Sequence, residues 1–253
     1  MKVIDSHCHL YSLSNVGEVV FRARNAGVEK VVVVSEDLHT MEQTLKLRDK
    51  YPEFILPGLG IHPVNALIMS QHEWDKAYSF LKIHAHEASC IGEIGLDFKY
   101  ATTEKEKEEQ LRTLHAQMEI AAENNLPLNL HSRRALRQTM EEAIEFHKNT
   151  GLPVLLHWFS HSMKLLRRTN EAGIFVSVGP SILFSDEALT LAHAINPQLV
   201  LVETDTPAPF NGKPSQPTWV VEVAEKLIKG YPDKDLTKEK LLDNTRQYLK
   251  ILQ

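Results

Sequence analysis

Two histidines near the start of the chain have a spacing that suits metal binding. They lie in Asp5-Ser6-His7-Cys8-His9, directly after Lys2-Val3-Ile4, which predicts a short strand. Because alternate side chains of a strand share a face, His7 and His9 point the same way and Cys8 points to the other side. Two parallel imidazoles form half of a metal site. A pair of histidines in a surface turn explains the same residues equally well.

Further imidazoles and carboxylates follow later predicted strands: His62, Glu93, His131, His157 and Asp205. Singly, each has an ordinary explanation, such as a hydrogen-bonded loop histidine, a helix cap at Glu93 or a turn at Asp205. Jointly, five such residues on five strands, added to the first pair, are hard to explain as turns. Even without His62, four imidazoles and two carboxylates exceed the three protein ligands of a usual catalytic zinc site. They suit two divalent ions about 3.5–4 Å apart, bridged by a carboxylate and a hydroxide.

The elements that must position these residues alternate along the chain. Short runs rich in Val, Ile and Leu predict buried strands, and the amphipathic segments between them predict helices. The predicted strands cover residues 2–4, 30–35, 54–60, 90–93, 126–130, 153–156, 174–178 and 199–203. The predicted helices cover residues 15–25, 39–50, 74–86, 103–124, 134–148, 162–172, 186–194, 218–229 and 237–252.

Eight strands alternating with helices predict an α/β fold, a single-domain (β/α)8 TIM barrel over residues 1–253 with additional C-terminal helices. A doubly wound open sheet is the competing fold. The barrel is favoured because the polar residues stand at the ends of many strands, and only closure brings all those ends round one axis. In this fold the C-terminal strand ends carry the chemistry.

Composition limits the function classes. The formal net charge is -5, whereas a protein that grips long nucleic acid through its overall field is more often basic. Any binding or cleavage of nucleic acid must therefore depend on a local basic patch or on bound metals. Two cysteines, Cys8 and Cys90, are too few for a disulfide framework and suit a reducing compartment. With no signal peptide and no membrane-spanning run in the sequence, we expect a cytoplasmic protein without membrane partners.

The sequence resembles the TatD family of metal-dependent deoxyribonucleases, within the amidohydrolase-type metal barrels. The matching stretches follow the family's order across the whole chain. They are DSHCHL near the start, GIHP around His62, IGEIGLDF around Glu93, LPLNLHSR around His131, LLHWFSHS around His157, LVETDTP around Asp205 and NTRQYL near the end.

The resemblance implies two metal sites that share Glu93 as a bridge. The first is held by His7, His9, Glu93 and Asp205, and the second by Glu93, His131 and His157. Departures from the family pattern are local and concern the substrate range. Trp158-Phe159-Ser160-His161 begins with Trp where a small residue is usual, Thr206 replaces Ala, and the stretch 211–217 has Lys213 as its only basic residue.

The ligand chemistry leaves Mg²⁺, Mn²⁺ and Zn²⁺ open. Arg133 follows His131 and is expected at the mouth of the site, where it could hold a phosphate bidentately or pair with a surface acid. His62 is expected either to bind substrate phosphate or to support the ligands. Arg134 and Arg137 are expected on the next helix. Asp97 and Glu203 could orient ligand imidazoles or serve packing, and His161 has no assigned role.

The resemblance, together with this ligand set, implies a metal-dependent exonuclease that cleaves DNA, or a small phosphodiester, with a hydroxide made by two metals. Glu93 would bridge the metals and Asp205 would take the proton. The alternative is hydrolysis of an amide, ester or lactone by the same centre, including an ester on a nucleic-acid carrier. A binding or scaffold protein with a vestigial site is a third possibility, which the complete ligand set argues against. We expect a monomer or small homo-oligomer.

Overall fold

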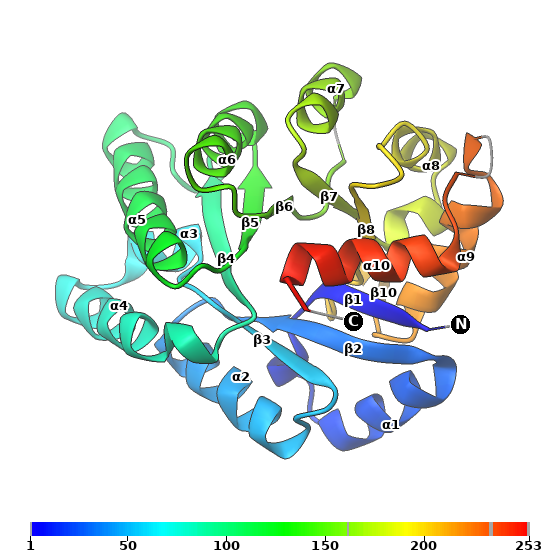
Figure 1. The fold of residues 1–253 in the computed structure, drawn as a ribbon. Coiled ribbons are helices and arrows are strands. Elements are labelled where there is room, and N and C mark those ends of the chain that lie inside the picture. Colours follow the sequence, from blue (N-terminus) through cyan, green and yellow to red (C-terminus); the bar gives the residue numbers. More distant parts are fainter. Residues whose placement is uncertain (1, 161, 233–234, 252–253) are drawn as a thin grey trace.

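The strands of the sheet follow one another round the molecule in sequence order (Figure 1). The computed structural model describes residues 2–160, 162–232 and 235–251, so His161 lies outside the described residues. The eight strands are parallel: β1 (Val3–Cys8), β2 (Val28–Val34), β3 (Ile55–Leu59), β4 (Cys90–Asp97), β5 (Leu128–Arg133), β6 (Val154–Leu156), β7 (Phe175–Val178) and β8 (Val200–Val202).

The sheet nearly closes into a barrel at the seam between β8 and β1. The backbone N–H of Asp205 donates to the carbonyl of His7 at 2.9 Å, and the N–H of His9 donates to the carbonyl of Thr206 at 2.7 Å. Ser6 Oγ donates to the carbonyl of Val202 at 3.0 Å. The prediction of a (β/α)8 barrel is confirmed, and the open doubly wound sheet is excluded because β1 and β8 are neighbours.

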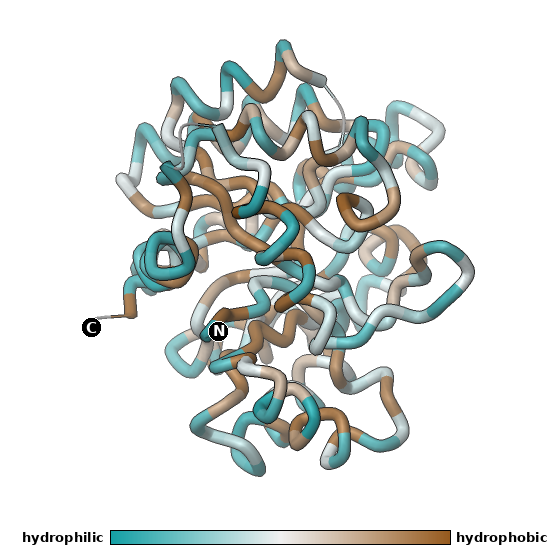
Figure 2. Tube along the Cα trace, turned by 90° about the vertical axis from the view of Figure 1, so that its right-hand side faces the viewer, coloured by the Kyte–Doolittle hydropathy of each residue, from teal (hydrophilic) through white to brown (hydrophobic). Residues whose placement is uncertain are grey.

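Helices cover the outside of the barrel (Figure 1). They are α1 (Val16–Ala26), α2 (Leu38–Lys50), α3 (Pro63–Ile68), α4 (Gln71–His84), α5 (Glu104–Glu123), α6 (Leu136–Thr150), α7 (Met163–Glu171), α8 (Asp186–Ala192), α9 (Trp219–Lys229) and α10 (Lys238–Leu249). Short 3-10 turns lie at η1 (Leu10–Ser12), η2 (Ala85–Glu87) and η3 (Pro180–Leu183). Figure 2 shows hydrophobic strand segments inside the molecule and alternating hydropathy along the outer helices, as amphipathic covering helices require. Among the described residues, no helix has the length and hydrophobicity needed to cross a membrane.

The inner face of the barrel has its own apolar cluster, separate from the layer under the helices. It includes Val32, Leu155 and Leu201 together with Tyr248 of α10. Tyr248 is fully buried, and its hydroxyl donates to the carbonyl of Leu128 at 3.1 Å. α10 therefore covers the N-terminal end of the barrel, which leaves the C-terminal strand ends as the accessible end of its interior.

Three local differences from the predicted elements concern the accessible end. α3 was not predicted; it begins because Pro63 occupies the first helical position and the His62 ring accepts a hydrogen bond from the N–H of Val64. The prediction that Arg134 lies on a helix was wrong: α6 begins at Leu136, and Arg134 is a loop residue with φ of 58°. A small hairpin, β9 (Pro209–Phe210) with β10 (Lys213–Pro214), was also not predicted.

Candidate metal centre

The six predicted ligand residues meet at the C-terminal end of the barrel because they continue the inner face of their strands. In a strand, side chains two residues apart share a face. His157 is two residues after the inward-facing Leu155, and Asp205 is four residues after the inward-facing Leu201, so both continue the inner face. His7 lies on β1, Glu93 on β4 and His131 on β5. Just beyond the ends of β1, β6 and β8 stand His9, His157 and Asp205, respectively.

The carboxylate of Glu93 lies at the centre of the group, and its two oxygens face different imidazoles. Oε2 lies 3.5 Å from Nε2 of His7 and 3.5 Å from Nε2 of His9. Oε1 lies 2.7 Å from Nδ1 of His131 and 2.9 Å from Nε2 of His157. A single carboxylate therefore joins two groups of nitrogen donors.

Asp205 completes the group on the Oε2 side. Its Oδ1 lies 3.3 Å from Nε2 of His9 and 3.6 Å from Nε2 of His7. Its backbone is left-handed, with φ of 49°, and its carbonyl accepts the N–H of Ala208 at 2.7 Å. Asp205 is therefore a turn residue, and its carboxylate also faces the imidazoles of His7 and His9. The turn expected at this residue and the approach to the imidazoles are thus both present.

The hydrogen-bond network sets which nitrogen of each imidazole faces the centre. Asn129 donates its amide to the carbonyl of Ser6 at 3.1 Å, so its Oδ1 accepts from Nδ1 of His7 at 2.9 Å. Tyr11 donates its hydroxyl to Glu36 at 2.9 Å, so the same oxygen accepts from Nδ1 of His9 at 2.8 Å. In the neutral rings both Nδ1 atoms therefore carry the hydrogen, and both Nε2 lone pairs face the centre.

This arrangement of donors fits a cation. The two Nε2 atoms of His7 and His9 lie 3.3 Å apart, beside one oxygen each of Glu93 and Asp205, and four lone-pair donors would repel one another without a positive charge between them. Burial by itself lowers the pKa of His9, but the hydrogen bond to Asp205 and the charge of Glu93 raise it to about 9. The position therefore attracts positive charge strongly.

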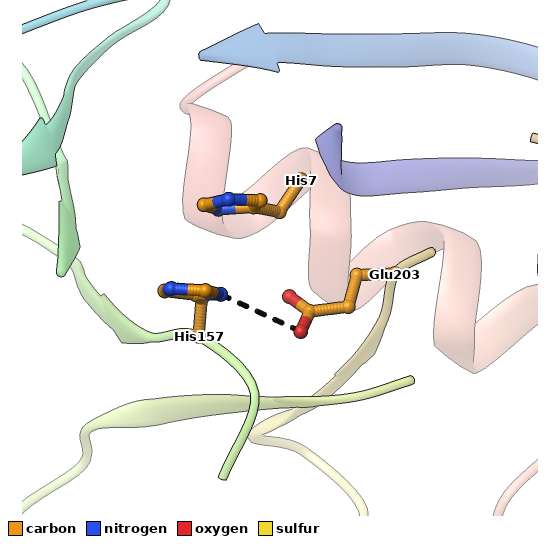
Figure 3. Close-up of side chains that lie close together, drawn as sticks. All are labelled: His7, His157 and Glu203. Atoms are coloured by element: carbon orange, nitrogen blue, oxygen red, sulfur yellow. Dashed lines mark ion pairs between the residues drawn. The ribbon is translucent and has the colours of Figure 1, made fainter. Parts of the chain in front are cut away.

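Carboxylates also lie behind the imidazoles on the Oε1 side. Oδ2 of Asp97 lies 3.3 Å from Nε2 of His131, on the opposite ring edge from Glu93. Oε1 of Glu203 lies 3.6 Å from Nδ1 of His157, whose ring stacks on that of His7 with centroids 3.8 Å apart (Figure 3). Outer carboxylates of this kind orient the imidazoles of metal sites and raise their basicity.

The charge of Glu93 is stabilised by its neighbours. Burial would raise the pKa of its carboxyl, but His157, His62, His7 and His131 together hold it well below its usual range. The pKa of Asp205 is also lowered, since burial is outweighed by the hydrogen bond from His9 and by nearby imidazoles. Both carboxylates are therefore anionic at neutral pH.

His62 and Arg133 both line the cavity above the site. Nδ1 of His62 accepts from Val64, so the neutral ring carries its hydrogen on Nε2, which lies 3.7 Å from Oε1 of Glu93. Burial lowers the pKa of His62 to about 3, which keeps the ring neutral. Arg133 is exposed, and it lines the same cavity of about 570 Å³ as His9 and Glu93.

Several residues of this network were not identified from the sequence. Asn129 is two residues before His131 on β5, so the period of the strand could have placed it on the inner face. Tyr11 and Glu36 carry no such signal, because their contact joins segments 25 positions apart. Cys8 behaves as expected of a core thiol: it is fully buried, and burial raises its pKa.

Comparison with known proteins identifies a family and a shared fold. The model of the family described as TatD related DNase matches residues 4–250. The chain is 31% identical to human deoxyribonuclease TATDN3 over 97% of this chain and 92% of that protein. It is 29% identical to the uncharacterized metal-dependent hydrolase YabD of Bacillus subtilis, over 99% and 98% of the two chains. The crystal structure of YjjV, a TatD homologue from Escherichia coli, shares the fold with a TM-score of 0.84 and 24% identity, covering 99% and 98%.

Proposed function

This chain belongs to the TatD-related DNase family of metal-dependent hydrolases, and from that premise we propose that it removes nucleotides from an end of a DNA strand by hydrolysing phosphodiester bonds. One observation supports the proposal above all others: the two oxygens of Glu93 face two separate groups of imidazole nitrogens. Such a shared carboxylate is the arrangement that two-metal hydrolases use.

In this proposal two divalent cations, Mg²⁺, Mn²⁺ or Zn²⁺, would be held with Glu93 in common. His7, His9, Asp205 and Glu93 would hold one, and His131, His157 and Glu93 would hold the other. When bound, the cations would supply Lewis-acid stabilisation of the phosphoryl oxygens and make water acidic enough to attack at neutral pH.

Side chains of the protein would accept the proton and bind the substrate phosphates. Asp205 is the carboxylate of the ligand set that would not bridge. Its lowered pKa means that it is anionic at neutral pH, the form that can accept the proton that the attacking water loses. The Nε2–H of His62 would donate to a phosphoryl oxygen. The guanidinium of Arg133 would hold a flanking phosphate bidentately at the rim.

The experiment uses a single-stranded oligonucleotide labelled at its 5′ end and the same strand labelled at its 3′ end. We expect stepwise shortening from one end with at least one of Mg²⁺, Mn²⁺ and Zn²⁺, and none with EDTA. Asp205→Asn is the matched inactive control because it keeps the size of the side chain. Hydrolysis of an ester, amide or lactone panel without oligonucleotide cleavage would overturn the proposal in favour of the same centre acting on another bond.

A further inference from the structure

Two aromatic side chains line the cavity above the metal centre. Trp158 directly follows His157 and lines this cavity, and Tyr100, which is 48% exposed, lines it too. The volume of about 570 Å³ is within the usual range for sites that bind small molecules and is large enough for a nucleotide. In the proposed function, the metal centre and Arg133 bind the phosphates of the substrate. Neither contact gives the indole of Trp158 in the same cavity a role.

Trp158 is held in a conformation that its side chain does not favour. Its φ is 45°, in the left-handed region that residues with a bulky side chain rarely adopt. The backbone N–H of Trp158 donates to Oγ of Ser177 at 3.2 Å. Unfavourable backbone conformations of this kind persist where the surroundings impose them, and they are common at functional sites.

The indole is also supported from behind. The ring of Phe210 packs against it, with centroids 4.9 Å apart and planes inclined by 32°. Phe210 is nearly buried and is placed by the β9–β10 hairpin, whose two turn residues, Asn211 and Gly212, both have positive φ, at 48° and 75°. Two positive φ angles are typical of the two-residue turns that join hairpin strands, and this hairpin brings Phe210 against the indole. The half-buried indole is therefore presented to the cavity as a preorganised wall.

We propose that Trp158 is a specificity-determining residue that stacks on the nucleobase next to the scissile phosphate, so that a phosphodiester carrying a base is preferred over one without a base. This inference rests on the function proposed above. A flat indole face accepts any base, which gives affinity without sequence preference. Local stacking also suits a chain with a net charge of -5, which lacks a general electrostatic attraction for DNA.

The kinetic test compares a dinucleotide with an otherwise identical phosphodiester that carries an abasic residue in place of one nucleoside. Loss of one base–aromatic stack usually corresponds to about 5-fold to 150-fold. Trp158→Leu should lower kcat/KM for the dinucleotide within that range and leave the abasic substrate nearly unchanged, while Trp158→Phe should retain most of the preference. Trp74→Leu is the control, because Trp74 stacks on Tyr78 of α4 and does not line the cavity. An equal fall for both substrates in Trp158→Leu would overturn the inference.

A binding measurement separates this inference from the proposed function. Intrinsic fluorescence is titrated with a short oligothymidine in EDTA, where no hydrolysis is expected. Wild type and Trp74→Phe should be quenched, Trp158→Phe should not, and an abasic oligomer should quench none of them. If wild type is quenched in this way but hydrolyses no oligonucleotide, the proposed function fails and the stacking role stands. If wild type cleaves dinucleotide and abasic substrate equally and shows no quenching, the stacking role fails and the proposed function stands.

Discussion

Replacement of Glu93 by Gln tests the two-metal arrangement most directly. Glu93→Gln keeps the volume of the side chain but removes its charge, and it turns one of the two oxygens into an NH₂ group. In wild type each oxygen of Glu93 lies 2.7–3.5 Å from imidazole nitrogens. In the variant, the NH₂ group takes the place of one of these oxygens, whichever way the amide is oriented. One cation therefore loses a ligand atom, and both lose the shared negative charge.

The magnitude follows from these distances. A cation held among these donors would lie within about 4 Å of the carboxylate. Two unit charges at about 4 Å interact by roughly 4 kcal/mol at an effective dielectric constant of about 20. That energy corresponds to a change in affinity on the order of 10³-fold, and the double charge of the cation makes it a lower bound. We expect both sites of Glu93→Gln to weaken by at least this factor.

The assay is metal content per chain after dialysis against a series of buffered Zn²⁺ or Mn²⁺ concentrations. Wild type should reach close to two ions per chain, and Glu93→Gln should remain nearly empty at concentrations that saturate wild type. His131→Ala is the comparison, since its Nδ1 faces only Oε1, and it should lose one ion and keep much of the other. Thermal unfolding of the metal-free variants checks that both fold. Two ions bound to Glu93→Gln with near wild-type affinity would refute the reasoning.

Four further predictions concern single residues. Asp205→Asn should keep most of its metal but lose about 10²–10⁴-fold in turnover, the usual loss of a general base, and full metal with near wild-type turnover would remove that role. Arg133→Ala should raise KM more for an oligonucleotide than for an aryl phosphodiester, and equal effects would exclude a flanking phosphate contact. Tyr11→Phe removes the acceptor that fixes the tautomer of His9, so calorimetry should show metal binding weaker by about 10- to 100-fold, and unchanged binding would contradict this role. Hydrogen bonds from His84 and Arg48 lower the pKa of Glu87 from 4.5 to about 2, so Glu87 stabilises the fold above about pH 4.5 and loses this effect as the pH falls. The Tm of Glu87→Gln should therefore fall less steeply than that of wild type between pH 5 and 3. Parallel curves of Tm against pH would contradict this role.

The barrel was predictable because its signals are local. Unbroken β-branched runs such as Val31–Val34 specify strands buried on both faces, and the alternation of strands with amphipathic segments specifies a parallel sheet. The two-residue period of a strand placed His7 and His9 on one face without any tertiary information, and their Nε2 atoms lie 3.3 Å apart. The end of α1 is also set locally, since Gly27 follows it with φ of 102°, a conformation that glycine adopts without strain.

The short elements at the accessible end depended on contacts that no sequence period records. α6 begins two residues later than expected, and Arg134 takes a left-handed loop conformation instead of a helical one. The β9–β10 hairpin covers only six residues, too few for a hydrophobic period, yet it brings Phe210 against Trp158 across more than 50 positions of sequence. Such segments take their conformation from the barrel beneath them.

Sequence alone therefore determined which residues could serve as ligands and at which end of the barrel they stand. The family resemblance implied how these residues divide between two sites, and the tertiary structure decided the contacts within each group: Oε2 of Glu93 lies toward His7 and His9, and Oε1 lies toward His131 and His157. The physical reason is that side-chain direction within a strand is fixed by local backbone geometry, whereas distances between side chains of different strands exist only after the sheet has closed. Closure through the β8–β1 seam brings Asp205 to His9, although they are nearly 200 positions apart in the chain.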